Sequence, residues 1–373
     1  MKNILYYMKR YGNKSFEEFP LNEVDGLILS QLSYLNLDTL IPSIDDTKED
    51  VSLIDCFDSS TIKAICQGTL DRKNNEKLIF YLKKSLRFKN LKANYFTNLF
   101  NVDEVLQFCA MTFFINNTMF ITYRGTDVTL LGWKEDLNMS FLEVIPSQKE
   151  ASRYFERVGN KRDLPIYVCG HSKGGNLAVY ASLSVKEELQ SKIKLILDYD
   201  GPGFQTDIYK TKEFHKIEHR IKKFSCGNAM IGILLYHSNH IHFVKARGVS
   251  IFQHDPYNWL LTKKGTFRYV KSVTIFSLTF EKTVGDYIET TSIDNRKKFL
   301  HILFKVGMEH SYATVLDWFR HPIRSLVGIF KRYKNLTKAD RIYFKKMVHR
   351  YRILWQENFK LFFKKKMRKS KTK

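Results

Sequence analysis

The stretch that most constrains this chain covers residues 164–183, LPIYVCGHSKGGNLAVYASL. An apolar, β-rich run leads into GHSKG, and a pattern rich in Ala and Leu, typical of a helix, follows. A serine held in a tight turn between a strand and a helix presents its hydroxyl above the sheet as a nucleophile elbow. Gly170 and Gly174 flank this turn because larger side chains there would collide with the crossing strand and helix. We therefore predict that Ser172 is a nucleophile at a helix N-terminus, where unpaired N–H groups favour a developing negative charge.

The overall composition is that of a folded protein with an unusual excess of positive charge. Its 373 residues can bury a full core as one large domain or two, and an apolar fraction of 44% argues against wholesale disorder. The formal net charge is +23, from 61 basic and 38 acidic residues. Such an imbalance favours an anionic partner such as a lipid surface, although a general lysine bias explains it equally well. Nucleic-acid binding rests on charge alone, and we do not expect it.

The cysteines and the absence of long apolar runs predict where in the cell the protein is found. Five cysteines occur without a C-x-x-C pair, at Cys56, Cys66, Cys109, Cys169 and Cys226. An odd number without metal-ligand spacing predicts reduced thiols in a cytosolic protein and gives no sign of a metal or cofactor. The first residues, MKNILYYMKRYGNK, lack the apolar core of a signal peptide, and no run approaches the ~20 apolar residues of a membrane span. We expect a cytoplasmic protein, with peripheral membrane contact left open.

Strand-like and helix-like segments alternate through the middle of the chain. Residues 15–40 predict a loop and an amphipathic helix capped by Asn22, and residues 42–101 read as polar and mostly helical. The sheet is expected to begin at Glu104, where VLQFCAMTFF and TMFITYRG flank a hairpin turn at residues 115–117. KIKLILDYDGPGF and HRIKKFSC predict further buried strands, and HFVKARG and VSIFQHDPYNWLL are also strand-like. This alternation predicts the α/β class, with a mostly parallel central sheet flanked by helices.

The predicted secondary structure changes beyond about Lys271, where the strand-like runs end. Helices are predicted over residues 281–306 and 311–330, without any catalytic signature. Residues 331–373 read as a basic amphipathic helix plus a disordered tip, and their acids are Asp340 and Glu357. A helix of this kind can lie on an anionic membrane surface, or it can pack on the domain as a solvated helix with a charged tail. Both interpretations stay open.

A second candidate element is the turn YRGTD, at the end of a predicted strand. A Gly-Thr pair in this place suits an oxyanion-hole loop, with the backbone N–H groups of Thr126 and Lys173 as donors, whereas an ordinary polar turn is the alternative. The Lys173 side chain favours either an acidic substrate group or, as the simpler interpretation, solvent. Glu135 and Asp136 in GWKEDL either bind a polar substrate group or are ordinary acids near a helix N-terminus.

Several further segments form an ordered series across about residues 20–260. They are LNEVDGLILSQLSYL, YRGTD followed by GWKEDLNMSF, VCGHSKGGNLAVYAS, YDGPGF, IGILL and QHDPYNW. With these segments the chain resembles the Mbeg1-like family, a bacterial domain of mostly unknown function related to the class 3 lipases. The resemblance implies an α/β-hydrolase fold and a serine hydrolase activity without a settled substrate. The last hundred or so residues lie outside it.

In the α/β-hydrolase order, the serine is followed by an acid and then by a histidine on a loop after the last strand. His254 occupies that place and is our candidate base, because a serine hydroxyl needs a histidine within hydrogen-bond reach. Class 3 lipases usually place the acid after the strand that corresponds to IKKFSC, but no carboxylate follows that strand here. Asp200, at the end of the preceding strand, is our prediction, with Asp198 or no acid at all as alternatives. Asp255, beside His254, is expected to point away from the histidine ring.

We therefore predict two regions and one activity. Residues 1–270 form a lipase-like hydrolase domain with a helical insert at about 43–100, and residues 271–373 form a helical basic C-terminal region. The expected function is cleavage of a small-molecule or lipid ester by Ser172 and His254 over a backbone oxyanion hole. The alternative is a catalytically silent protein of the same fold that binds anionic membrane surfaces through its basic C-terminus.

Overall fold

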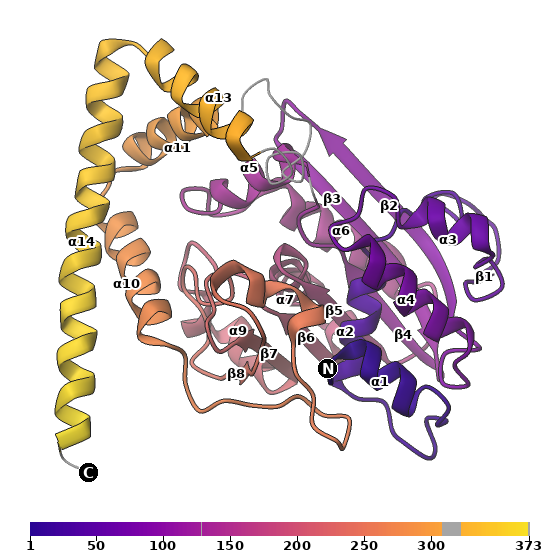
Figure 1. The fold of residues 1–373 in the computed structure, drawn as a ribbon. Helices are drawn as coiled ribbons and strands as arrows, with labels where there is room; N and C mark the ends of the chain where they lie inside the picture. The colour runs from indigo at the N-terminus through magenta and orange to yellow at the C-terminus, as the bar shows by residue number, and fades with distance from the viewer. Residues whose placement is uncertain (128, 308–321, 372–373) are drawn as a thin grey trace.

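The computed structural model describes residues 1–127, 129–307 and 322–371. A sheet of eight strands forms its centre, and the order of the strands in the sheet follows their order in the chain (Figure 1). The strands are β1 Val51–Ser52, β2 Lys92–Asn101, β3 Leu106–Ile115, β4 Thr118–Tyr123, β5 Ile166–His171, β6 Ile193–Tyr199, β7 Ile221–Cys226 and β8 Ile241–Val244. Neighbours from β1 to β4 are antiparallel, and neighbours from β4 to β8 are parallel. The predicted α/β sheet flanked by helices is confirmed.

The hairpin between β3 and β4 has the geometry that its sequence predicts. Asn116 and Asn117 both have positive φ, at 49° and 51°, as a two-residue turn of the type I′ kind requires. Asparagine tolerates this backbone conformation better than most residues, so the turn fixes the register in which Ile115 pairs with Thr118. All residues of β3 and β4 are buried, which places this hairpin in the interior of the sheet.

The sheet begins earlier than the predicted start at Glu104. Residues 42–101 contain helices α3 Ser59–Ile65 and α4 Arg72–Lys83, but β2 also lies in this segment and pairs with β3. The mostly helical prediction is wrong for β2 for two reasons. Its second half is rich in exposed and polar residues, and a bulge between Asn94 and Thr97, with Tyr95 at φ 60°, interrupts the alternation of buried side chains.

Helices cover both faces of the sheet. Alternate residues of β3 contribute to two separate cores: Cys109, Met111 and Phe113 face one, and Phe108 and Ala110 face the other. Helices α1 Ile4–Tyr11, α2 Glu23–Leu32 and α4 contribute to the first core, and α6 Pro146–Gly159 and α7 Lys173–Ser184 contribute to the second. The remaining helices before residue 270 are α5 Leu130–Asn138, α8 Glu187–Lys192 and α9 Lys212–Ile217.

The predicted cap of the first amphipathic helix is confirmed. The Asn22 side chain accepts a hydrogen bond from the Val24 N–H at 2.8 Å, and the Asp25 side chain accepts one from the Asn22 N–H at 3.0 Å. These reciprocal bonds satisfy N–H groups that have no partner within the helix, so α2 begins at Glu23.

The C-terminal helices stand at one side of the molecule, and α14 runs along α10 (Figure 1). They are α10 Ile275–Glu289, α11 Ile293–Gly307, α13 Pro322–Asn335 and α14 Lys338–Lys371. The helix predicted over 281–306 is interrupted near Ser292, whose hydroxyl accepts a hydrogen bond from the Asn295 N–H at 3.4 Å. The helix predicted over 311–330 lies partly outside the described residues, as does the predicted tip.

The state of the cysteines and the length and polarity of the helices can be read from the structure. The five cysteines are free of disulfide bonds, and Cys56 is the least buried of them. Within the described ranges, each helix is too short or too polar to cross a membrane.

Candidate active site

Ser172 lies at the junction of β5 and α7 in a conformation that few residues adopt. Its φ is 58° and its ψ is −134°, and its N–H donates to the Tyr199 carbonyl at 2.9 Å. A Cβ at Gly170 would lie 2.2 Å from the Gly174 oxygen, and one at Gly174 would lie 2.2 Å from the Tyr123 oxygen. Both positions therefore require glycine, as predicted, and the turn holds Ser172 in a strained backbone conformation typical of functional sites.

The acid and the histidine predicted from the sequence meet in the structure. Oδ2 of Asp200 lies 2.6 Å from Nδ1 of His254, and Oδ1 of Asp200 accepts a hydrogen bond from the Ser225 hydroxyl. Asp200 follows β6 directly and is fully buried. Burial acts to raise its pKa, but the hydrogen bond and charge of His254 outweigh burial and hold the pKa below the ordinary value of an aspartate. Asp200 is therefore a carboxylate at neutral pH, suited to orienting a histidine ring.

The two neighbouring aspartates have other partners. Asp198 accepts the Gly201 N–H at 2.8 Å and forms an ion pair with Lys223 at 2.6 Å, so both of its oxygens are occupied. Asp255 accepts the Tyr257 N–H at 2.9 Å, and burial raises its pKa to about 6. Of the three candidates, Asp200 alone contacts the His254 ring.

The segment that carries His254 is wrongly predicted as a strand. It forms two short 3-10 turns, Ser250–His254 and Pro256–Asn258, because Pro256 lacks an N–H and the Asp255 side chain caps the second turn. The Trp259 indole N–H donates to the Gln253 carbonyl at 2.9 Å, which holds the two turns together. This irregular segment lies after β8, in the position expected for the histidine loop.

His171 and Tyr34 support the His254 segment, and sequence reasoning assigned no role to either. Nε2 of His171 lies 2.8 Å from the His254 carbonyl oxygen, and the Tyr34 hydroxyl lies 3.1 Å from Nδ1 of His171. Burial, together with the nearby His254, lowers the pKa of His171 to about 3, so its ring is neutral at physiological pH. A neutral ring has one N–H to donate, and the His254 carbonyl is an acceptor for it.

The ring of His171 packs against the ring of His254 beside the elbow. The rings of His171 and His254 have centroids 4.5 Å apart, and Ser172 is the residue after His171. Among the described residues, no hydrogen bond joins the Ser172 hydroxyl to His254. Bonds of this kind are often long before substrate binds and shorten in the productive complex.

The YRGTD turn lies against the elbow. A Cβ at Gly125 would lie 3.0 Å from the Ser172 Cβ and 2.2 Å from the Tyr34 hydroxyl oxygen. Thr126 follows, and its hydroxyl donates to Oδ2 of Asp136 at 2.5 Å. Neither the Thr126 N–H nor the Lys173 N–H, at the first position of α7, has a hydrogen-bond partner among the described residues. Both amides are therefore available to an acceptor beside Ser172.

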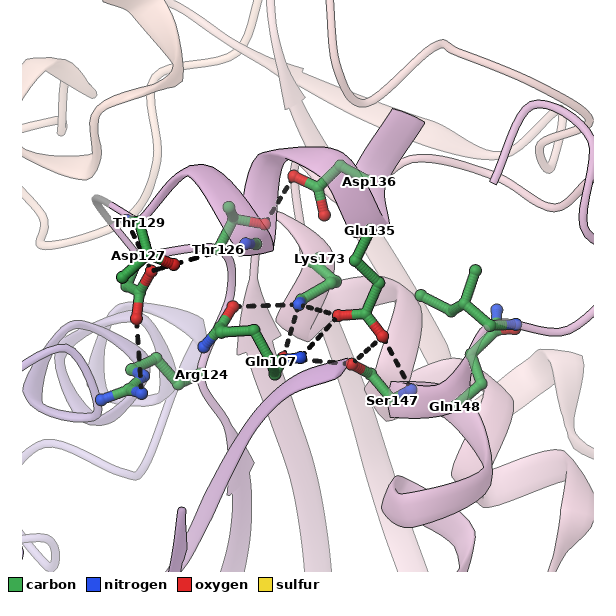
Figure 2. Close-up of polar contacts among 12 residues, drawn as sticks. Gln107, Arg124, Thr126, Asp127, Thr129, Glu135, Asp136, Ser147, Gln148 and Lys173 are labelled. Atoms are coloured by element: carbon green, nitrogen blue, oxygen red, sulfur yellow. Dashed lines mark hydrogen bonds and ion pairs between the residues drawn. The ribbon is translucent and has the colours of Figure 1, made fainter. Parts of the chain in front are cut away.

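The predicted solvation of the Lys173 side chain is wrong. Lys173 is 1% exposed, and its ammonium forms an ion pair with Glu135 at 2.7 Å (Figure 2). The first acid of GWKEDL is therefore a buried partner of the residue after Ser172, and the second, Asp136, is the partner of Thr126. No sequence pattern pointed to this pairing, because Glu135 and Lys173 are far apart in the chain.

Comparison with known families fits this geometry. A family model described as Mbeg1-like matches residues 82–305, which is more than half of the chain. The chain belongs to the Mbeg1-like family. The matched range of this Mbeg1-like chain includes Thr126, Ser172, Asp200 and His254, whereas α13 and α14 lie beyond it.

Other comparisons add little detail to this Mbeg1-like protein. A solved structure described as the crystal structure of M37 lipase is 15% identical, covering 66% of this chain and 84% of the lipase chain with a TM-score of 0.35. No curated protein sequence matches the chain. The α/β-hydrolase fold is seen in the structure itself, in the parallel half of the sheet, the helices on both faces and the serine at the strand-to-helix turn.

In residues 1–127, 129–307 and 322–371, His, Cys, Asp and Glu side chains do not gather in groups of three or more that suit a metal ion.

Asp136 gives this Mbeg1-like fold a measurable pH dependence. Its Oδ1 is buried without a hydrogen-bond partner among the described residues, and burial raises its pKa to about 6. Because the folded-state pKa of Asp136 lies above its ordinary value, the contribution of this group to stability is greatest at low pH and is lost as pH rises through about 6. We expect Asp136→Asn, which retains an acceptor for Thr126, to raise the thermal midpoint at pH 7.5 by roughly 2–5 °C.

The control for this expectation is the same comparison at pH 4, where the wild-type carboxyl is largely neutral in the folded protein. The two thermal midpoints should nearly coincide there. A difference between the two proteins that is equal at both pH values, or larger at pH 4, would show that Asp136 is not the titrating group.

Proposed function

We propose that this protein is a serine hydrolase that cleaves carboxylic esters. The observation that carries the proposal is the 2.6 Å hydrogen bond between His254 Nδ1 and Asp200, formed beside a serine in a strained elbow. The backbone amides of Thr126 and Lys173, which lack a hydrogen-bond partner among the described residues, are the proposed oxyanion hole of such a site. The fold and the family are consistent with hydrolysis but do not establish it, so the activity rests on this constellation.

The proposed steps are those of ester cleavage by a serine, a histidine and an aspartate. Nε2 of His254 takes the proton of the Ser172 hydroxyl as Oγ attacks the ester carbonyl carbon. Asp200 holds the ring with Nδ1 protonated and stabilises the imidazolium that forms. The carbonyl oxygen becomes an oxyanion and accepts hydrogen bonds from the Thr126 and Lys173 amides. Collapse of this intermediate expels the alcohol, protonated by His254, and water then cleaves the acyl-serine by the same route.

A fluorophosphonate probe tests the proposal directly. We expect the wild-type protein to be labelled once, with the label on the peptide that contains Ser172, because phosphonates react with serines activated by a histidine. Denatured protein serves as the control and should remain unlabelled. Native protein that never reacts would contradict hydrolysis and favour the silent binding protein of the same fold.

We also propose that the protein contacts an anionic lipid bilayer through α13. Its Ile323, Leu326, Val327 and Phe330 are 78%, 63%, 62% and 59% exposed. Their spacing places them on one face of the helix, which is an exposed apolar stripe. Lys and Arg greatly outnumber the acids Asp340 and Glu357 in residues 322–371. The apolar stripe can bury itself at the boundary between headgroups and acyl chains, and the positive charge can bind acidic headgroups. Together they favour an anionic bilayer as the partner.

Vesicle sedimentation provides the measurement for this contact. We expect binding to vesicles of phosphatidylserine and phosphatidylcholine and much weaker binding to phosphatidylcholine alone. Leu326→Ser with Phe330→Ser should lower the partition coefficient at least about 10-fold, because each apolar side chain leaving water contributes roughly 1.5–3 kcal/mol when fully buried. Phe100→Ser, which replaces a similarly exposed aromatic on β2, is the matched control. Equal losses in both proteins would contradict docking through α13.

A further inference from the structure

The side chain of Lys173, whose backbone amide is a proposed oxyanion-hole donor, ends in a buried polar cluster. The Lys173 ammonium lies 2.7 Å from Oε2 of Glu135, 2.6 Å from the Gln107 carbonyl oxygen and 3.0 Å from Oε1 of Gln107 (Figure 2). Three acceptors thus satisfy its three N–H groups. The side chains of Lys173 and Glu135 are both 0% exposed, so water does not compete for these bonds.

Glu135 connects this ammonium to three other parts of the fold. Its Oε1 accepts the N–H of Ser147 at 2.9 Å and the hydroxyl of Ser147 at 2.6 Å, and its Oε2 accepts the Gln107 N–H at 3.2 Å. Gln107 lies in β3, Ser147 at the start of α6, and Glu135 itself in α5. The carboxylate therefore ties β3, α5 and α6 to the first residue of α7.

Stability alone does not explain a pair of this kind. Removing two opposite charges from water costs about as much as their attraction returns, and an apolar pair of similar volume is often equally stable. What an apolar pair lacks is direction, because the ammonium and carboxylate fix the side chain of residue 173 at one position and orientation.

The next residue of α5, Asp136, contacts the side chain of Thr126, whose backbone amide is the other proposed donor. Asp136 accepts the Thr126 hydroxyl at 2.5 Å, so consecutive residues of α5 hold the side chains of Thr126 and Lys173, the two residues proposed as oxyanion-hole donors (Figure 2). Helix α5 is short, and its own position is fixed by the contacts of Glu135 with β3 and α6.

We propose that Lys173 and Glu135 are positioning residues that hold the Lys173 backbone amide at the oxyanion position. This inference rests on the proposed hydrolase function and assigns the two side chains no contact with substrate. The pair acts through the backbone: when the ion pair is absent, the first turn of α7 is free to shift, and the amide no longer meets the oxyanion in the transition state.

The test removes both charges at once. Each single substitution would leave one buried charge without its partner and risk unfolding, whereas Lys173→Met with Glu135→Gln leaves none and keeps an acceptor for Ser147. With p-nitrophenyl butyrate as substrate, we expect kcat to fall about 10- to 100-fold with KM within about twofold of wild type. The inhibition constant of an alkyl boronic acid, whose adduct with serine mimics the oxyanion, should rise by a similar factor.

Lys134→Met is the control for loss of a positive charge, because Lys134 is an exposed lysine of α5, next to Glu135. This variant should leave kcat and the inhibition constant unchanged. A folded double variant with the kcat and boronate affinity of wild type would overturn the positioning role while leaving the hydrolase proposal intact. Equal losses in the Lys134 variant would also overturn it. Wild-type protein that neither hydrolyses the ester nor reacts with a fluorophosphonate would overturn the hydrolase proposal and this inference with it.

Discussion

Ser172→Ala is expected to lower kcat for ester hydrolysis by about 10⁶-fold and to abolish fluorophosphonate labelling, a loss of the size measured when serine proteases lose their nucleophile. The physical reason is that Ser172 is the residue at the strand-to-helix turn, where its φ of 58° is the backbone conformation of a nucleophile elbow. Substrate binding and the two backbone amides would remain in this variant, so its rate would still exceed that of the uncatalysed reaction by a small factor. Steady-state kinetics with p-nitrophenyl butyrate and labelling of purified protein measure the two effects.

Ser182→Ala is the matched control for this substitution. Ser182 is a buried serine of the same helix, and its hydroxyl donates to the Ala178 carbonyl at 2.7 Å, away from the elbow. Its loss should leave kcat and labelling near the wild-type values. Labelling that persists in the Ser172 variant and disappears in the Ser182 variant would place the nucleophile elsewhere.

Asp200→Asn is expected to lower kcat by about 10³- to 10⁴-fold, the magnitude known for the equivalent change in serine proteases. An asparagine at this position presents an amide to Nδ1 of His254, which favours the wrong tautomer of the ring and removes the charge that stabilises the imidazolium. Because Asp200 is fully buried and its pKa is held down by His254, the wild-type site keeps this charge at neutral pH. The pH dependence of kcat/KM and circular dichroism of the variant complete the measurement.

Asp198→Asn is the control for the Asp200 substitution. Asp198→Asn leaves Lys223 without its ion pair and should lower the thermal midpoint, with kcat per folded molecule close to that of wild type. A larger loss of kcat in the Asp198 variant than in the Asp200 variant would transfer the role to Asp198.

The features that could be predicted from the sequence are those whose residues lie close together in the chain. A strand, a glycine-flanked serine and a helix follow one another within twenty residues, so their pattern sufficed to place Ser172. The order of groups along the chain also selected Asp200 and His254, which the structure joins by a hydrogen bond. What this order left undecided was the choice between Asp198, within β6, and Asp200, directly after it, because their hydrogen-bond partners depend on packing between distant segments.

The parts that were missed depend on contacts between distant segments. Lys173 seemed to be a solvent-exposed helix residue because its partners, Gln107 and Glu135, lie on another strand and another helix. Strand β2 was missed because burial of its first half comes from its neighbours, while its own sequence is polar. In the same way Ser225 gave no signal until β7 was placed beside β6, where its hydroxyl meets Asp200.

The strand order of the sheet has a consequence for how the protein is made. Because every strand pairs with the one synthesised just before it, the sheet can grow at a single edge while the chain leaves the ribosome. The residues before helix α1 instead bind a segment made much later, since the Asn3 side chain donates to the Tyr257 carbonyl at 2.7 Å and the Lys2 carbonyl accepts the Leu261 N–H at 2.7 Å. The first residues to be synthesised therefore gain these partners only after the segment that follows His254 has been made.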